Sequence, residues 1–162
     1  MKRILQSLFA LLLCLCLTAC GEPSTPQGTP SEDGVFTHRG LTVTLTADFV
    51  DYSEGEQFIY ISQPCMVDGY CHAKEEIIDP SATEMPTLTQ YAELWLGEGV
   101  TLTPVADTPY YAATTTRQDL TVWCVFAETD TSFYLIRFTA ETVAYPTLEP
   151  QFLLWAQSIE VE

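Results

Sequence analysis

The sequence predicts an α+β domain, in which a largely antiparallel β-sheet of about six to seven strands is flanked by two helices. Three observations predict this class. Residues 41–46 alternate strictly between apolar residues and threonine, which is typical of a strand with one buried face. Two later segments carry apolar residues at helical spacing. Most of the predicted strands are neighbours in the sequence, so short connections can pair them antiparallel.

The first strands precede the first helix. The folded part begins near Val35, and strand 41–46 is followed by predicted strands at 58–61 and 70–77. Between the last two lie Pro64 and the pair Asp68-Gly69, which are turn signals. The sequence therefore predicts a hairpin connection between the second and third strands.

The first helix begins with a capping box. Thr87 and Gln90 are spaced so that each side chain can bond the other residue's backbone amide. Gly97 or Gly99 ends the helix. One apolar face results from the helical spacing of Leu88, Tyr91, Ala92 and Trp95.

The remainder of the chain is rich in strands. Segments 110–116, 120–128 and 131–140 are dense in β-branched and aromatic residues, and a short acidic turn joins the last two into a predicted hairpin. Thr147 is the predicted cap of a second helix. Residues 158–161 are predicted to form a terminal strand.

The N-terminus has the pattern of a secretory signal. Lys2 and Arg3 precede an apolar run over residues 8–17, which is too short to span a membrane with polar flanks on both sides. The run ends in Leu17-Thr18-Ala19-Cys20, which resembles the lipobox of bacterial lipoproteins. The resemblance implies cleavage before Cys20 and a diacylglyceryl group on its thiol. An ordinary secretory signal cleaved after Ala19 is the alternative.

The chain divides into three parts on this interpretation. Residues 1–19 are the signal peptide, and residues 20–34 are the lipidated cysteine and a tether rich in proline, glycine and acidic residues. Such a composition predicts disorder, because it offers no large apolar side chain to bury. Residues 35–162 form the folded domain. The protein is therefore predicted to lie outside the cytoplasm, held to a bacterial membrane by lipid on Cys20.

The protein is strongly acidic. It has 22 Asp and Glu against 6 Lys and Arg, and loss of Lys2 and Arg3 with the signal peptide changes the net charge from −16 to −18. Such a domain offers no electrostatic attraction to nucleic acid and is repelled by anionic lipid head groups. The predicted contact with the bilayer is therefore through the acyl chains on Cys20.

A family resemblance rests on the order of elements over residues 35–162. The chain carries a GLTVTL strand, Lys74-Glu75-Glu76 at the end of a later strand, a Leu88-x-x-Tyr91-Ala92 helix, a long hairpin and a closing Pro150-x-Phe152-x-x-Trp155 helix. This frame resembles small bacterial lipoproteins with a PsbP-like or DcrB-like α/β domain. The resemblance implies a non-enzymatic accessory or extrinsic subunit.

Three cysteines remain in the domain. If residues 67–69 form a hairpin loop, Cys65 and Cys71 lie opposite each other, and a disulfide is the predicted link between them. Cys65, Cys71 and His72 are an alternative set of ligands for zinc or copper. Cys124 shares a strand face with apolar residues and is predicted to be a buried free thiol.

Two residues are candidates for ligand contact. Arg137 interrupts the apolar strand face of Phe133 and Leu135, so it either forms an ion pair with an acid such as Glu76 or Glu141 or binds an anionic ligand. In its predicted strand, the side chain of Trp123 points to the face opposite that of Cys124. If a helix leaves one sheet face partly uncovered, Trp123 can line a binding groove there.

No catalytic motif is evident. The sequence has no GxSxG, no SxxK and no glycine-rich phosphate loop. We therefore predict a non-enzymatic module without a cofactor, which binds a protein partner in the cell envelope. A lipoprotein that binds a small ligand or a metal is the alternative, and an enzyme is the third hypothesis.

Overall fold

The computed structural model describes residues 28–77 and 85–162. The predicted signal peptide 1–19, Cys20 and the tether up to residue 27 lie outside these residues. The described chain forms an eight-stranded and a three-stranded β-sheet, in which every strand pair is antiparallel. The predicted α+β class is confirmed. Within the described residues, no helix combines the length and apolar character needed to cross a membrane.

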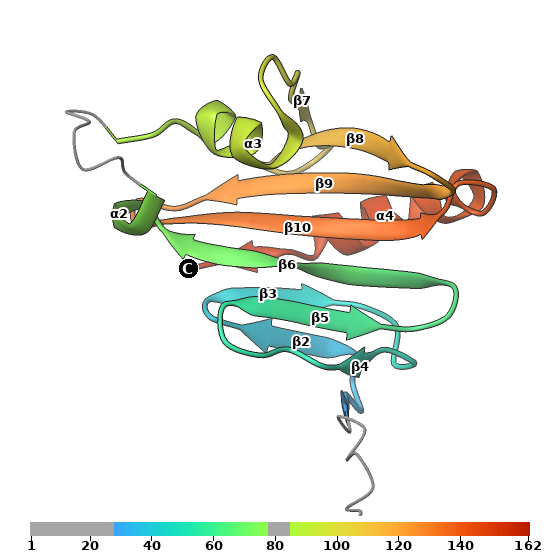
Figure 1. Ribbon diagram of the computed structural model, residues 1–162. Helices are drawn as coiled ribbons and strands as arrows, with labels where there is room; N and C mark the ends of the chain where they lie inside the picture. The colour runs from blue at the N-terminus through green and yellow to red at the C-terminus, as the bar shows by residue number, and fades with distance from the viewer. Residues whose placement is uncertain (1–27, 78–84) are drawn as a thin grey trace, which may run out of the picture.

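The large sheet has its longest strands at its centre (Figure 1). Its edges are strands of two residues, a form that limits pairing with other chains. In spatial order the strands are β1 (Thr29–Pro30), β4 (Val50–Asp51), β5 (Gln57–Ile61), β6 (Cys65–Ala73), β10 (Ser132–Glu141), β9 (Leu120–Glu128), β8 (Tyr111–Arg117) and β7 (Thr103–Pro104).

The small sheet joins the start of the domain to its end. Its strands are β11 (Glu160–Val161), β3 (Leu41–Thr44) and β2 (Val35–His38), in this spatial order. The helices of the described chain are α2 (Lys74–Ile77), α3 (Leu88–Leu96) and α4 (Tyr145–Gln157).

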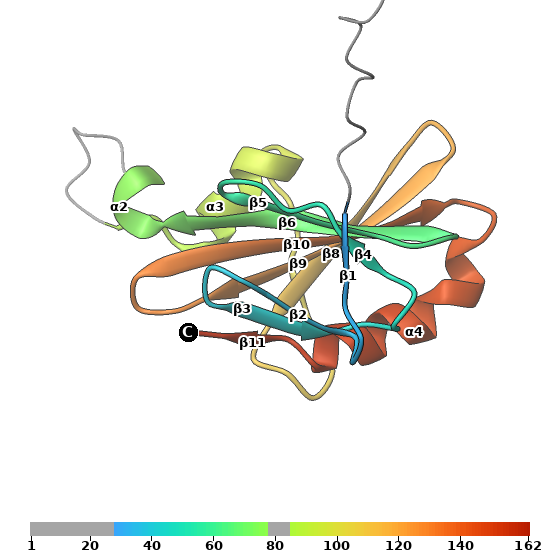
Figure 2. The same cartoon turned by 90° about the horizontal axis from the view of Figure 1, so that it is seen from below.

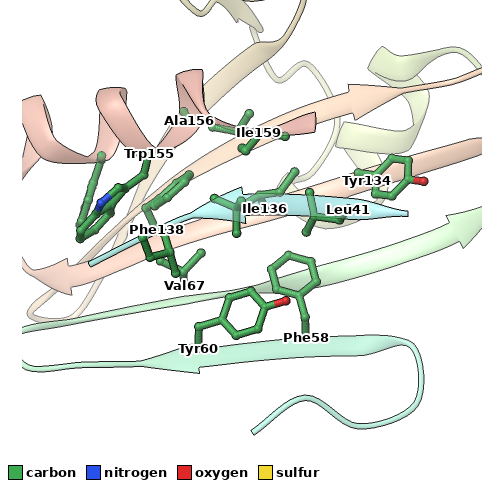
Figure 3. Packing of buried hydrophobic residues seen from close by; sticks show 14 of the residues in the cluster. Leu41, Phe58, Tyr60, Val67, Tyr134, Ile136, Phe138, Trp155, Ala156 and Ile159 are labelled. Atoms are coloured by element: carbon green, nitrogen blue, oxygen red, sulfur yellow. The ribbon is translucent and has the colours of Figure 1, made fainter. Parts of the chain in front are cut away.

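The two faces of the large sheet are covered differently (Figure 2). Helix α3 lies over part of one face, whereas α4 and the small sheet lie on the other. The main core fills the space on the α4 side, where Phe138 and Ile136 of the sheet meet Leu41 of β3 and Trp155 of α4 (Figure 3). A second, smaller core lies beneath α3 around Tyr91, and it includes Phe126, Phe133 and Leu135.

Two predictions from local sequence signals are confirmed. The capping box of Thr87 and Gln90 is present, and α3 ends at Gly97. Strands β9 and β10 form the predicted hairpin. Helix α4, however, begins at Tyr145 after Ala144, without a side-chain cap. The predicted cap at Thr147 is therefore wrong, since Pro146 is already at the start of the helix, where a missing amide costs no hydrogen bond.

The third strand and the domain boundary also differ from the prediction. Strand β6 starts at Cys65 and ends at Ala73, and residues 74–77 form a short helix instead of its end. Thr29 and Pro30 pair with β4, so ordered structure begins inside the segment predicted to be a disordered tether. The eight strands of the large sheet and a separate three-stranded sheet also exceed the six to seven strands expected.

Candidate functional site

The α3-side face of the large sheet carries a charged pair in its middle. Asp68 of β6 and Arg137 of β10 are directly paired residues of adjacent strands, and Arg137 donates a hydrogen bond from Nη2 to Oδ2 of Asp68. Arg137 therefore does bind an acid, but the partner is Asp68 at the centre of the sheet. The predicted partners Glu76 and Glu141 are wrong, because Asp68 had been assigned to a turn.

The pair is buried unequally. Asp68 is 3% exposed, whereas 29% of the Arg137 side chain is exposed. Burial raises the pKa of the Asp68 carboxyl, and the Arg137 guanidinium opposes this shift. Oδ1 of Asp68 and Nε of Arg137 have no hydrogen-bond partner among the described residues. Both atoms are buried, so this unused hydrogen-bonding capacity lies inside the protein and not on its surface.

A pocket of about 300 Å³ lies beside Arg137. Its walls come from the C-terminal end of α3 and from strands β8, β9 and β10, which only the tertiary fold brings together. One part of the lining is cationic and another is apolar. The lining residues are Trp95, Leu96, Thr115, Arg117, Val122, Cys124, Leu135 and Arg137.

The pocket gathers positive charge in an acidic protein. The described residues contain four Lys and Arg side chains, and two of them, Arg117 and Arg137, line this pocket. Both guanidinium groups act on the Cys124 thiol and favour its ionised form. Arg117 and Arg137 line one pocket from two different strands.

Cys124 is not a reactive thiol in this setting. It is 1% exposed, and burial raises the pKa of its thiol to about 12 against the effect of the two arginines. A thiol with this pKa remains protonated at neutral pH and is a poor nucleophile. The prediction of a buried free thiol at Cys124 is confirmed.

One end of the same sheet face is not covered by any helix of the described residues (Figure 2). Helix α3 lies over the end of the face that carries Tyr70 and Phe133, whereas the opposite end lies beyond the helix (Figure 2). Ile61 and Leu120 are each 41% exposed there. Strand register places five residues on this area, which we call the open half: Ile59, Ile61, Met66, Thr139 and Leu120.

Trp123 lies on the other face of the sheet. Its ring centroid is 5.5 Å from that of Phe138, and it packs against the main core on the α4 side. Arg137 pairs with Cys124 and shares the α3-side face with it. Trp123 and Arg137 therefore cannot contact the same small ligand, and ligand contact at Trp123 stays a prediction.

Cys65 and Cys71 belong to one strand. Both lie in β6, which continues without a turn through Asp68 and Gly69. Six residues of extended strand separate their Cα atoms by about 20 Å, far beyond the reach of a disulfide. The two thiols are free, so the predicted Cys65–Cys71 disulfide is wrong.

The same strand geometry is incompatible with the alternative metal site at Cys65, Cys71 and His72. Cys71 and His72 are adjacent in β6, so their side chains point to opposite faces, and Cys65 lies six residues away. Nδ1 of His72 is 3.0 Å from the hydroxyl of Tyr91 beneath α3. Within residues 28–77 and 85–162, no three His, Cys, Asp or Glu side chains are grouped to hold a metal ion.

Asp68 and Arg117 were missed from the sequence. Asp68 was assigned to a turn because glycine follows it, but Gly69 lies inside β6, where a Cβ atom would overlap the carbonyl oxygen of Leu135. Glycine at this position meets a packing requirement of the strand interior. Arg117 lines the same pocket as Arg137 through the pairing of β8, β9 and β10; the β9–β10 hairpin was predicted, but the pairing of β8 with β9 was not.

A second pocket has fewer charged side chains available to bind a ligand. It measures about 580 Å³ and lies near the N-terminal end of α3, where it is lined mainly by threonines and aliphatic residues. Its charged lining residue is Glu128, which already forms a 3.0 Å ion pair with Lys74. We therefore place the candidate binding site at Arg137.

Comparison with known proteins supports the fold alone. No family model matches the chain, and no curated protein matches it. A crystal structure of a protein from Bacteroides thetaiotaomicron is similar over 82% of this chain, with a TM-score of 0.52 and 10% sequence identity. The chain spans about half of that protein, with 49% of its length covered.

Proposed function

We propose that this protein is an extracytoplasmic lipoprotein, anchored to a bacterial membrane through lipid on Cys20, whose domain binds a protein partner in the cell envelope. The lipobox-like sequence Leu17-Thr18-Ala19-Cys20 supports the anchor. The net charge of the domain supports it further, because so acidic a surface is repelled by anionic head groups and needs acyl chains to stay on the membrane.

One observation carries the binding function. The open half of the α3-side face exposes Ile61 and Leu120, and it borders a pocket that contains two arginines. An apolar area beside convergent charged groups is typical of an interaction surface. Ile61 and Leu120 do not belong to the main core, which lies on the other face of the sheet.

The proposed module is non-enzymatic and belongs to the PsbP-like or DcrB-like lipoproteins. The order of strands and helices supports this finer fold, with a long β9–β10 hairpin and a closing helix packed on it. The protonated state of the Cys124 thiol, the thiol of the pocket, supports binding without chemistry. A small-ligand lipoprotein is the second candidate, because about 300 Å³ is at the lower end of ligand-pocket volumes.

Photocrosslinking in the envelope tests the docking face. A photoreactive amino acid replaces Leu120 on the open half or, as the matched control, Leu154 on the outer side of α4, where the leucines are 41% and 59% exposed. We expect one discrete protein adduct from position 120 and none from position 154. Arg117→Gln should reduce the adduct. Equal adducts from both positions would contradict the proposal.

A further inference from the structure

We infer that the pocket beside Arg137 recognises a carboxylate carried on a short apolar stem. This inference rests on the proposed binding function and names the chemical group that the site takes. It follows from the two arginines and the apolar side chains that line the pocket, and from the volume of the pocket.

The cationic wall fits a carboxylate. Arg137 donates from Nη2 to Asp68, and it lines the pocket with a side chain that is 29% exposed. Arg117 brings a second guanidinium, so the three charged groups sum to one net positive charge. Guanidinium forks match the planar geometry of carboxylates. The site therefore suits one negative charge.

The apolar lining residues indicate the chemistry of the rest of the ligand. The apolar lining residues are Trp95, Leu96, Val122 and Leu135. A strongly hydrated dianion such as phosphate would leave these side chains without contacts, and its second charge would meet the nearby Asp68 carboxylate. A carboxylate with an aliphatic or aromatic stem can pair with the arginines and contact the apolar side chains. A pocket of about 300 Å³ has room only for a small group.

Two sources can supply this chemistry. One is a chain end of the protein partner, and the other is a free organic acid. Calorimetric titration of the full chain in nonionic detergent compares N-acetylphenylalanine for the first with 3-phenylpropanoate for the second. The uncharged amide of 3-phenylpropanoate controls for partition into micelles, and inorganic phosphate controls for general anion binding. We expect both carboxylates to bind, and neither the amide nor phosphate to do so.

Variants separate recognition from folding. Arg117 is on the surface, so Arg117→Gln should leave the fold intact and raise the Kd by about tenfold or more, as expected for a charge-assisted hydrogen bond. Arg39→Gln is the matched control, because Arg39 is also exposed and pairs with Glu56 elsewhere. Asp68→Asn removes the competing carboxylate and should lower the Kd severalfold, a gain that a purely structural role would not produce.

The outcomes are distinct. Tighter binding of N-acetylphenylalanine assigns the source to a chain end, and tighter binding of 3-phenylpropanoate assigns it to a free acid; both support a carboxylate site. Equal binding of acid and amide, equal binding of phosphate, or an unchanged Kd in Arg117→Gln would overturn it. If these titrations fail while position 120 still crosslinks to one protein, the docking proposal stands without this inference. If both fail, the proposed function fails as well.

Discussion

Asp68 and Arg137 form the charged centre of the α3-side sheet face, and their unequal burial has an energetic consequence. When Arg137 is removed, the carboxylate of Asp68 remains in a site where it is 3% exposed. When Asp68 is removed, Arg137 can still reach water, since 29% of its side chain is exposed. The loss of arginine should therefore cost more stability than the loss of aspartate.

A double-mutant cycle measures this difference. Arg137→Met should lower the free energy of unfolding by about 3 kcal/mol or more, because it leaves a buried charge unpaired. Asp68→Val should cost less, about 1 kcal/mol. The double variant should be more stable than Arg137→Met alone. Urea unfolding gives all four values, and a double variant that loses the sum of the two single effects would show that the residues do not interact.

Because of the buried thiols, the free energy of unfolding should depend on pH in the alkaline range. Burial raises the pKa of Cys124 to about 12 and that of Cys65 to about 11, from the usual 9.0. Above pH 9 the unfolded chain releases these protons while the folded chain keeps them. Each such thiol should therefore lower the free energy of unfolding by about 1.4 kcal/mol per pH unit between its unfolded and folded pKa values.

Urea unfolding between pH 8 and pH 11 tests this dependence. Stability should be level below about pH 8 and should fall above pH 9, with a shallower fall in Cys124→Ala. The variant's own loss of packing is present at every pH, so only the slope is compared. An identical slope in both proteins would show that Cys124 does not keep its proton in the folded state.

At the scale of single elements, β6 shows where local reasoning failed. The capping box at Thr87 and the β9–β10 hairpin were predicted correctly because neighbouring residues determine them. In β6, the pair Asp68-Gly69 has the local signature of a turn. Its true role depends on β5 and β10, which contribute the Phe58 ring and the Leu135 carbonyl around Gly69. Such a role is set by residues distant in sequence.

Gly69→Ala tests this account of β6. The new methyl group would overlap the Leu135 carbonyl oxygen and lie 2.6 Å from the Phe58 ring, so we expect a loss of about 3 kcal/mol in unfolding free energy. Gly55→Ala is the control. Gly55 has a φ of +62° and nothing within 4 Å, so only backbone strain of about 1 kcal/mol is expected there. Similar losses in thermal or urea unfolding would contradict a packing role for Gly69.

The candidate site was predictable only in part. Arg137 stood out because it interrupts an apolar strand face, and Cys124 because it lies on one. Arg117 and Trp95 line the same pocket only because β8, β9 and β10 pair in the observed register and α3 packs on them. The packing of α3 depends on residues distant in the sequence, so no local pattern predicts this pocket. The disulfide prediction failed for the same reason, because it assumed a turn where β6 is continuous.

At the scale of the whole molecule, the acidic charge of the domain makes the proposed lipid anchor testable. The domain is too acidic to be attracted to anionic lipid, so attachment should depend entirely on Cys20. Cys20→Ser should move the protein from the membrane fraction to the soluble fraction, as measured by fractionation and immunoblotting. Intact mass of the unsubstituted protein should show the acyl groups. A Cys20→Ser protein that stays on membranes after a salt wash would contradict lipid anchoring.

The central claim is that the molecule binds through the pocket beside Arg137, and the three tryptophans of the chain allow a direct measurement. Trp95 lines this pocket, whereas Trp123 and Trp155 lie in the core on the other face. We would record the three indole N–H signals of the ¹⁵N-labelled full chain in nonionic detergent while adding 3-phenylpropanoate, with Trp95→Phe to assign them. The account predicts a saturable shift of the Trp95 signal alone. A larger shift at Trp123 or Trp155, or no shift at any of the three, would contradict it.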